Sequence, residues 1–273
     1  MSNFTEYLTY TKSPKPYPEA FVFSPSKFSL FIERPHQFYR EQVLGESGFT
    51  GNTSSVLGTI VHAIAVAVAR DEPIDKVEIE RYIASKEPSE DYDPDAVRRE
   101  YREVAEALVN GYVLENRRNY LATEIALQAD VCKDYFLGGS IDVLEGTSQD
   151  TMVVDYKTYS GTTKPKSIPN HYKYQLLIYA AIAIANNYNV TRIRLVYVNR
   201  PIVGEISPKT GKQFKSYNST VTVLTELLTQ EDMDYIYSMI HLAVDSLEAA
   251  KKHPELTHVI WHDSRLAIDY KEE

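Results

Sequence analysis

The sequence predicts an α/β fold, in the broad sense that includes α+β, with a central mixed β-sheet flanked by helices and a mainly helical N-terminal part. Helical periodicity dominates residues 24–118. Short β-branched or alternating runs, separated by Gly, Ser, Asn and Asp, follow from residue 119. A helical run, a buried strand and a second long helix then alternate to residue 252, as in proteins that pack helices on a mixed sheet.

Length and composition are those of a folded chain. The 273 residues, 43% hydrophobic and 25% charged, fit one large domain or two small ones. We expect one domain over residues 24–273, divided into a mainly helical part (24–118) and a sheet-containing core (119–273). Residues 1–23 are expected to form an extended arm, because this Pro-, Lys- and Tyr-rich segment has no period.

Several protein classes are excluded at this stage. No run approaches ~18 uncharged apolar residues and no basic-then-apolar leader is present, so we expect a cytoplasmic protein that neither spans a membrane nor is secreted. The lone Cys132 excludes an internal disulfide and a four-cysteine zinc or iron–sulfur site, so any metal must have oxygen and nitrogen ligands. A net charge of −9 disfavours broad attraction to nucleic acid, although a local basic strip can still bind phosphates.

Residues 24–118 predict a series of helices. Ser24 as N-cap and Pro25 at the first position open one helix, Pro35 separates it from the next, and Gly45 ends the second. The other expected helices begin at Ser54 or Ser55, run from about 74 to 86, and run from about 94 to 118.

The remainder predicts strands and two helices. Strands are expected at 119–130, 134–145 and 151–158, the last two joined as a hairpin by the turn at 146–150. A helix at 169–187, a strand at 190–199, a strand near 219–226 and a helix from about 229 to 252, capped by Thr229, follow.

The sharpest local feature is the apolar strand that ends in Asp155, Tyr156 and Lys157. Strand periodicity places Asp155 and Lys157 on one face, and a hairpin could bring Asp142 beside Asp155. Paired carboxylates suit a hard cation such as Mg²⁺ or Mn²⁺. Lys157 would then hold the nucleophile or neutralise phosphate charge, whereas in a plain structural strand it would be a surface cation.

Five elements in this order resemble the PD-(D/E)XK nucleases, specifically the RecB-like and RecE-like exonuclease branch that includes the CRISPR-adaptation exonucleases. The elements are Gly58-x-x-x-His62, Glu124, Gly139-Ser140-Ile141-Asp142, Asp155-Tyr156-Lys157 and Gln175-x-x-x-Tyr179. Taken singly, His62 fits a packed core histidine and Tyr179 a core aromatic, and only their place in the series favours functional roles. The resemblance covers roughly residues 24–200 and implies a restriction-endonuclease-like core.

The resemblance implies a catalytic centre. His62, Asp142, Asp155 and the backbone carbonyl of Tyr156 would bind Mg²⁺ or Mn²⁺, and Lys157 would orient or activate the attacking water.

It also implies a further set of contacts. Glu124 would serve as an additional acidic residue, for a second metal or for a water on the metal. Gln175 and Tyr179 would contact the scissile or adjacent phosphate, and Thr158 would support the site by a hydrogen bond.

Basic residues after the catalytic strand are candidates for binding DNA. Lys164, Lys166, His171 and Lys173 form a candidate phosphate track, and Lys209, Lys212 and Lys215 form a second basic loop. A solvated loop is the alternative for both. His258 and His262 lie one helical turn apart but lack the pattern of a zinc protease, and no site is expected there.

The resemblance thus implies a deoxyribonuclease that acts at linear single- or double-stranded DNA ends in recombination, repair or replication, and such a chain would suit a phage. Arg34-Pro35 stands where many relatives have Cys-Pro, so no iron–sulfur cluster is expected. No Walker A sequence is present, so any helicase or annealing activity would belong to a partner chain. Whether the chain forms an oligomer stays open.

Three alternatives remain at this stage. The first is a structure-selective or restriction-like endonuclease. The second is a non-catalytic DNA-end-binding relative of the fold, against which the intact Asp142, Asp155 and Lys157 argue. The third is a metal-free structural protein with a chance Asp-x-Lys, which does not account for five elements in order.

Overall fold

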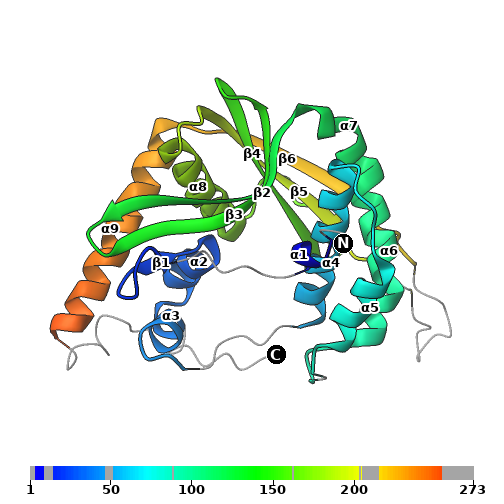
Figure 1. The fold of residues 1–273 in the computed structure, drawn as a ribbon, viewed down its shortest axis with the longest axis horizontal. Helices are drawn as coiled ribbons and strands as arrows, with labels where there is room; N and C mark the ends of the chain where they lie inside the picture. Colours follow the sequence, from blue (N-terminus) through cyan, green and yellow to red (C-terminus); the bar gives the residue numbers. More distant parts are fainter. Residues whose placement is uncertain are drawn as a thin grey trace.

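A computed structural model describes residues 4–8, 15–46, 52–87, 89–161, 163–202, 204 and 215–253. These residues build a six-stranded mixed sheet with helices on both faces, as the sequence predicts (Figure 1). The described helices include none that is long and apolar enough to cross a bilayer.

The sheet has the order β1-β3-β4-β5-β6, with β2 paired to β3. The strands are β1 (Phe21–Phe23), β2 (Tyr120–Cys132), β3 (Tyr135–Thr147), β4 (Asp150–Tyr159), β5 (Val190–Asn199) and β6 (Val221–Leu227). The predicted β3–β4 hairpin is confirmed, since these strands pair antiparallel. Strands β4 and β5 are parallel, and α8 (Asn170–Ala185) lies in the connection that such a pair requires.

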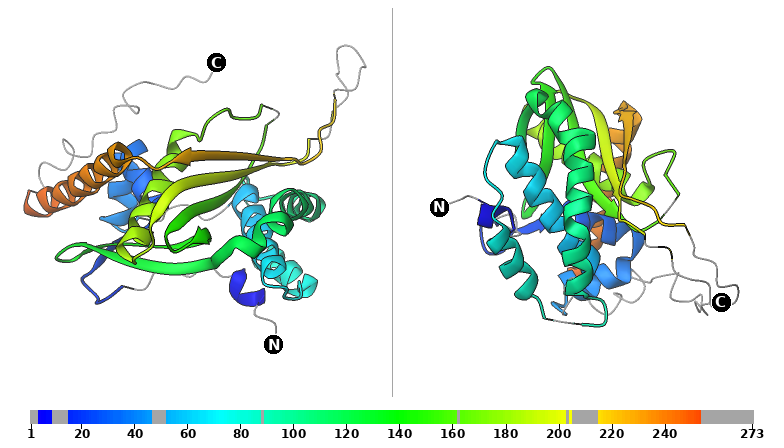
Figure 2. Two further views of the ribbon diagram at one scale, coloured as in Figure 1. Left: turned by 90° about the horizontal axis from the view of Figure 1, so that it is seen from above. Right: turned by 90° about the vertical axis from the view of Figure 1, so that its right-hand side faces the viewer.

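Two helical layers cover the sheet, as Figure 2 shows from two further sides. One layer contains α1 (Phe4–Tyr7), α4 (Thr53–Ala69), α5 (Lys76–Ala84) and α6 (Pro94–Leu108). The other contains α2 (Pro25–Glu33), α3 (Pro35–Gln42), α8 and α9 (Gln230–Lys252). Residues 24–118 therefore supply helices to both faces of the sheet.

Strand alternation explains the two cores. Val153 on β4 and Leu195 on β5 lie in the core formed with α8, whereas the next residues, Val154 and Val196, lie in the core formed with α4. Successive strand residues point to opposite faces, so these continuous apolar strands fill both cores at once.

The N-terminal segment differs from the expected extended arm. Residues 4–7 form α1, and residues 21–23 form β1 beside β3. Phe4 and Leu8 are buried against the α4 layer, at 0% and 4% exposure. These contacts join distant parts of the chain, so no local periodicity in residues 1–23 reveals them.

Helix starts follow their capping residues. Ser24 accepts the N–H of Lys27, and Thr229 caps α9, both as predicted. The N-cap of α4 is Asn52 rather than Ser54 or Ser55, since Asn52 and Ser55 form a reciprocal capping box.

The helix predicted over about 94–118 is confirmed in its extent, but it is not a regular α-helix throughout. Helix α6 ends at Leu108 and continues as a π turn (Val109–Val113), α7 (Leu114–Asn116) and a 3₁₀ turn (Arg117–Asn119). A Cβ on Gly111 would lie 2.9 Å from Val221 Cγ2, so this wide turn packs tightly on β6. Tertiary packing thus overrides the regular periodicity of the sequence.

Candidate active site

The site begins where β3 and β4 separate. Their last regular pair towards the site is Val143 with Val154. Beyond this pair, the side chain of Asp142 takes the place of a backbone carbonyl as the acceptor between the strands. Its Oδ2 accepts the N–H of Tyr156 at 2.7 Å. A buried N–H must find an acceptor, so this bond lets the strands diverge without leaving the donor unpaired.

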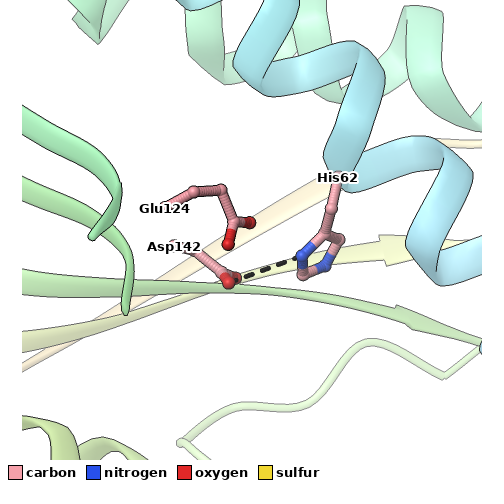
Figure 3. Close-up of side chains that lie close together, drawn as sticks. All are labelled: His62, Glu124 and Asp142. Carbon is pink, nitrogen blue, oxygen red and sulfur yellow. Dashed lines mark ion pairs between the residues drawn. The ribbon is translucent and has the colours of Figure 1, made fainter. Parts of the chain in front are cut away.

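Three potential ligands converge at this point. His62 extends from α4, Glu124 from β2 and Asp142 from β3, as Figure 3 shows. One ligand atom from each lies within 4.8 Å of the others. His62 Nδ1 is 3.4 Å from Asp142 Oδ1, and His62 Nε2 is 2.8 Å from the carbonyl oxygen of Tyr156.

Glu124 reaches the cluster from an unusual backbone conformation. Its φ is +46°, in the left-handed region that non-glycine residues rarely adopt. Ser140 Oγ donates to Glu124 Oε2 at 2.8 Å and fixes the carboxylate. Strained residues cost roughly 1–3 kcal/mol and gather at functional sites, which favours a role for this carboxylate beyond packing.

Asp155 and Lys157 form a buried ion pair next to the cluster. Asp155 is 1% exposed, and Lys157 Nζ donates to its Oδ1 at 2.7 Å. Both side chains lie on one face of β4, as strand periodicity predicts.

Electrostatics give His62 the character of a cation. Burial lowers the pKa of His62, but the charge and hydrogen bond of Asp142 outweigh burial and raise this pKa to about 9. Burial raises the pKa of Asp142, but His62 and then Lys157 outweigh it and hold this pKa below its ordinary value. The carboxylates thus attract positive charge, which a protonated imidazole supplies in the absence of a metal.

Two other carboxyl groups resist ionisation. Burial, and then the charge of Asp142, raises the pKa of Glu124 to about 7. Burial raises the pKa of Asp155 to about 6, against the opposing charge of Lys157. Burial lowers the pKa of Lys157, but Asp155 and Asp142 outweigh it and raise this pKa above its ordinary value. Three carboxyl groups and one ammonium therefore lie in a small volume where burial disfavours the ionised form of each group.

A recess of about 630 Å³ opens onto these groups. The structure brings seven of the predicted residues to its lining: His62, Glu124, Asp142, Asp155, Lys157, Gln175 and Tyr179. Gln175 and Tyr179 both come from α8, four residues apart. The two helical layers and the sheet thus all contribute side chains to one cavity.

Glycine is required at one point of the lining. A Cβ on Gly139 would lie 3.0 Å from Pro25 Cδ and 3.1 Å from Tyr179 Cε1. The bare backbone of β3 therefore lets α2 and α8 approach closely. At Gly58, by contrast, the nearest atom to an added Cβ is Thr158 Oγ1 at 3.7 Å, an ordinary contact.

Other predicted residues lie outside this recess. Lys173 is 3.1 Å from Glu226 Oε2 and 3.0 Å from Asp232 Oδ1, so its ammonium joins α8 to β6 and α9. Lys164 lines a second recess, described below. Thr158 and Lys166 line neither recess. Four residues named above lie outside the described residues: Lys209, Lys212, His258 and His262.

Sequence reasoning missed Arg70. Its guanidinium lines the recess, donates to Thr123 Oγ1 at 2.8 Å, and donates to Tyr7 Oη at 2.8 Å. Arg70 is the C-cap residue of α4, eight residues after His62, and this position about two helical turns farther along was the available signal. Tyr7 belongs to the segment expected to be an extended arm, which gave no such signal.

The donor set fits a divalent cation. Carboxylate oxygens at short mutual distances are ligands that Mg²⁺ and Mn²⁺ take, and the imidazole nitrogen of His62 adds a ligand of the kind that transition metals take. Asp155 Oδ2 is buried and has no hydrogen-bond donor among the described residues, although Lys157 Nζ lies 2.6 Å away. A buried acceptor without a hydrogen bond is unfavourable, and a bound cation would satisfy it.

The comparison with protein families agrees with this geometry. Residues 22–254 match the family model of the PD-(D/E)XK nuclease superfamily. The chain belongs to this superfamily. The match contains helices α2 to α9 and strands β2 to β6, so the fold and the superfamily expected from the five ordered elements are confirmed.

One solved structure shares this fold, and a second shows a weaker similarity. The superfamily member described here is similar to the "Putative exonuclease" of Eubacterium rectale, with a TM-score of 0.52 and 10% identity over 89% of this chain and 87% of that one. It is also similar to LHK-Exo in complex with dAMP, with a TM-score of 0.34 and 15% identity over 73% of this chain and 97% of that one. No curated protein matches the chain.

Proposed function

We propose that this nuclease-superfamily protein is an Mg²⁺- or Mn²⁺-dependent exonuclease that hydrolyses phosphodiester bonds at DNA ends. The observation that carries the proposal is one recess in which the His62–Glu124–Asp142 cluster adjoins the Asp155–Lys157 ion pair. The five ordered elements that resemble the exonuclease branch support the preference for ends over internal bonds.

The residues divide the chemistry between them. His62, Glu124, Asp142 and Asp155 would hold the metal, with the carbonyl of Tyr156 beside them. When bound, Mg²⁺ or Mn²⁺ offsets the charge that develops on the phosphate and eases the loss of a proton from water.

Lys157 and α8 position the reactants. The Lys157 ammonium, held by Asp155, orients the attacking water and stabilises negative charge on the phosphate in the transition state. Gln175 and Tyr179 orient the phosphate, and Arg70 adds a second positive charge to the same recess.

The test compares linear single-stranded, linear double-stranded and closed circular DNA in Mg²⁺ or Mn²⁺. Wild type is compared with Asp155→Ala and Lys157→Ala, and with Lys86→Ala as a matched control, because Lys86 lies on neither recess. We expect metal-dependent loss of linear DNA only, abolished by the first two substitutions and retained in the control.

The other outcomes each favour a different function. Cutting of the closed circle would replace the exonuclease by an endonuclease. A folded wild type that binds DNA ends without degrading them would favour a non-catalytic relative. Cellular partners such as a helicase or an annealing protein, and a role in recombination or repair, stay predictions of the sequence.

A further inference from the structure

A second recess lies beyond the active site along β4. It measures about 420 Å³, and its lining includes Tyr159, Lys164, Asn199, Lys215 and Tyr217. These residues come from β4, from the chain after it, and from both sides of the β5–β6 connection. No Asp or Glu is among its described lining residues, although the whole chain carries a net charge of −9.

Its two lysines differ from Lys173 in their partners. Lys173 is neutralised by two carboxylates, whereas neither Lys164 nor Lys215 is in an ion pair with any residue that the structure describes. Lys215 Nζ lies 5.2 Å from the centroid of the Tyr217 ring, and that ring is 39% exposed. The recess therefore presents positive charge beside an accessible aromatic face.

A row of tyrosines links this recess to the catalytic lysine. Lys157 Nζ lies 5.8 Å from the ring centroid of Tyr172. The Tyr172 and Tyr197 rings are 5.6 Å apart, and Tyr197 stacks on Tyr159 at 4.0 Å with 12° between the rings. Lys157 and Tyr159 are two residues apart on β4 and so share a face.

The walls of the recess are held by hydrogen bonds. Asn199 is 5% exposed, its Oδ1 accepts from the N–H of Thr220 at 2.9 Å, and its Nδ2 donates to the carbonyl of Asn218 at 3.0 Å. Ile202 and Tyr217 exchange two backbone hydrogen bonds of 2.8 Å. The aromatic and basic groups are thus presented on a fixed frame rather than on free side chains of a loop.

We propose that this second recess binds a single-stranded segment of the DNA whose scissile phosphate lies at Asp155 and Lys157. Unpaired bases stack on the tyrosine rings, and their phosphates contact Lys164 and Lys215. A duplex keeps its bases paired and stacked inside, so it presents no base face to these rings. The inference rests on the proposed nuclease function and names its substrate class, a strand that is single-stranded on this side of the cleavage site.

The test measures binding in EDTA, where cleavage does not interfere. Fluorescent 12-nucleotide single strands and blunt hairpin duplexes are titrated with the full chain, over a range of salt concentrations. The variants are Lys164→Gln with Lys215→Gln, and Tyr217→Ser. The matched controls are Lys86→Gln and Tyr82→Ser, because Lys86 Nζ lies 4.5 Å from the Tyr82 ring in a pair that lines neither recess.

We expect the double lysine variant to weaken single-strand binding about tenfold and to reduce the slope of log K against log salt by about 1.4, at about 0.7 for each lost phosphate contact. Tyr217→Ser should weaken single-strand binding by roughly fivefold or more and reduce the quenching of 2-aminopurine in the strand. Duplex binding should change less than twofold, and the controls should match wild type.

Two outcomes overturn the inference: recess variants that bind single strands as tightly as the controls do, or an equal loss of affinity for single strands and duplexes. The proposed nuclease function fails separately, if wild type hydrolyses no DNA in Mn²⁺. The affinities in EDTA do not depend on that result, so the two failures are distinguishable.

Discussion

Tyr156 is tied to Asp142 through its backbone N–H, which donates to Oδ2 at 2.7 Å, while its carbonyl oxygen lies 2.8 Å from His62 Nε2. One residue of β4 thus contacts β3 through its donor and α4 through its acceptor. Backbone groups make both contacts, so the positions of two predicted ligands depend on the course of β4 more than on the Tyr156 side chain.

The substitution Asp142→Asn removes the negative charge of Asp142 but keeps an oxygen that can accept the hydrogen bond from Tyr156. An amide oxygen can still accept the Tyr156 N–H, so we expect the protein to fold. Loss of the carboxylate should weaken Mn²⁺ binding and reduce the cleavage rate by about 10²- to 10³-fold. Calorimetric titration with Mn²⁺ and initial rates on linear DNA check this. A variant that binds Mn²⁺ as wild type does would show that Asp142 is not a ligand.

The substitution Lys157→Met should have opposite effects on metal binding and on activity. The Lys157 ammonium occupies Asp155 and so competes with a metal for that carboxylate. Its removal should tighten Mn²⁺ binding roughly 3- to 10-fold, because less charge repels the ion. Cleavage should fall about 10²-fold or more, since the positioning charge is lost. Lys157→Arg, which keeps the charge, is the control, and weaker Mn²⁺ binding by Lys157→Met would contradict the assignment.

The metal-free protein should lose stability as pH rises. The pKa values of His62 (about 9), Glu124 (about 7) and Asp155 (about 6) lie above their ordinary values of 6.5, 4.5 and 3.8. The folded chain therefore holds more protons than the unfolded chain between about pH 4 and 9, and the free energy of unfolding falls through that window. Urea unfolding in EDTA at pH 5, 7 and 9 measures the fall.

Two controls connect this pH dependence to the site. Glu124→Gln removes one of the three groups, so its free energy of unfolding should fall less between pH 5 and 9 than that of wild type. Mn²⁺ at pH 9 should restore stability, because the ion replaces the lost protons. A wild type whose stability in EDTA rises from pH 5 to 9 would show that these shifts are absent.

Alanine at two glycines should have contrasting effects. In Gly139→Ala the new Cβ would lie 3.0 Å from Pro25 and 3.1 Å from Tyr179, so we expect a loss of about 1–3 kcal/mol in stability and lower activity. In Gly58→Ala the Cβ fits, and the α4 helix should gain up to about 1 kcal/mol. Denaturant unfolding of both variants checks the contrast, and equal losses would contradict it.

The sequence predicted what depends on local patterns. The apolar strand that ends in Asp155, the Ser24 and Thr229 caps and the β3–β4 hairpin are all local signals, and each is confirmed in the structure. Lys173 was expected to contact DNA phosphates, but its ammonium forms ion pairs with Glu226 and Asp232. Both carboxylates are distant from Lys173 in the sequence, so no local pattern predicts these ion pairs.

The sequence predicted which side chains lie together at the candidate site, but not the geometry in which they meet. The spacing of Asp155 and Lys157 fixes their shared face, and this is confirmed. The positive φ of Glu124 and the contact of Arg70 with Tyr7 arise from tertiary packing, for which the sequence has no period. Local rules therefore predicted which side chains are candidates, and only the assembled layers gave the position of each atom.

The division of the site between two helical layers has a consequence for biosynthesis. His62 is synthesised long before β5, the strand that completes the pairing of β4. The last residue of β5, Asn199, follows His62 by 137 residues (199 − 62). At about 5–20 residues per second, that interval lasts roughly 7–27 s. During this interval the nascent chain contains His62, the first of the candidate metal ligands, but not the complete sheet that the other ligands require. Any catalytic activity at this site would therefore have to wait until the sheet is complete.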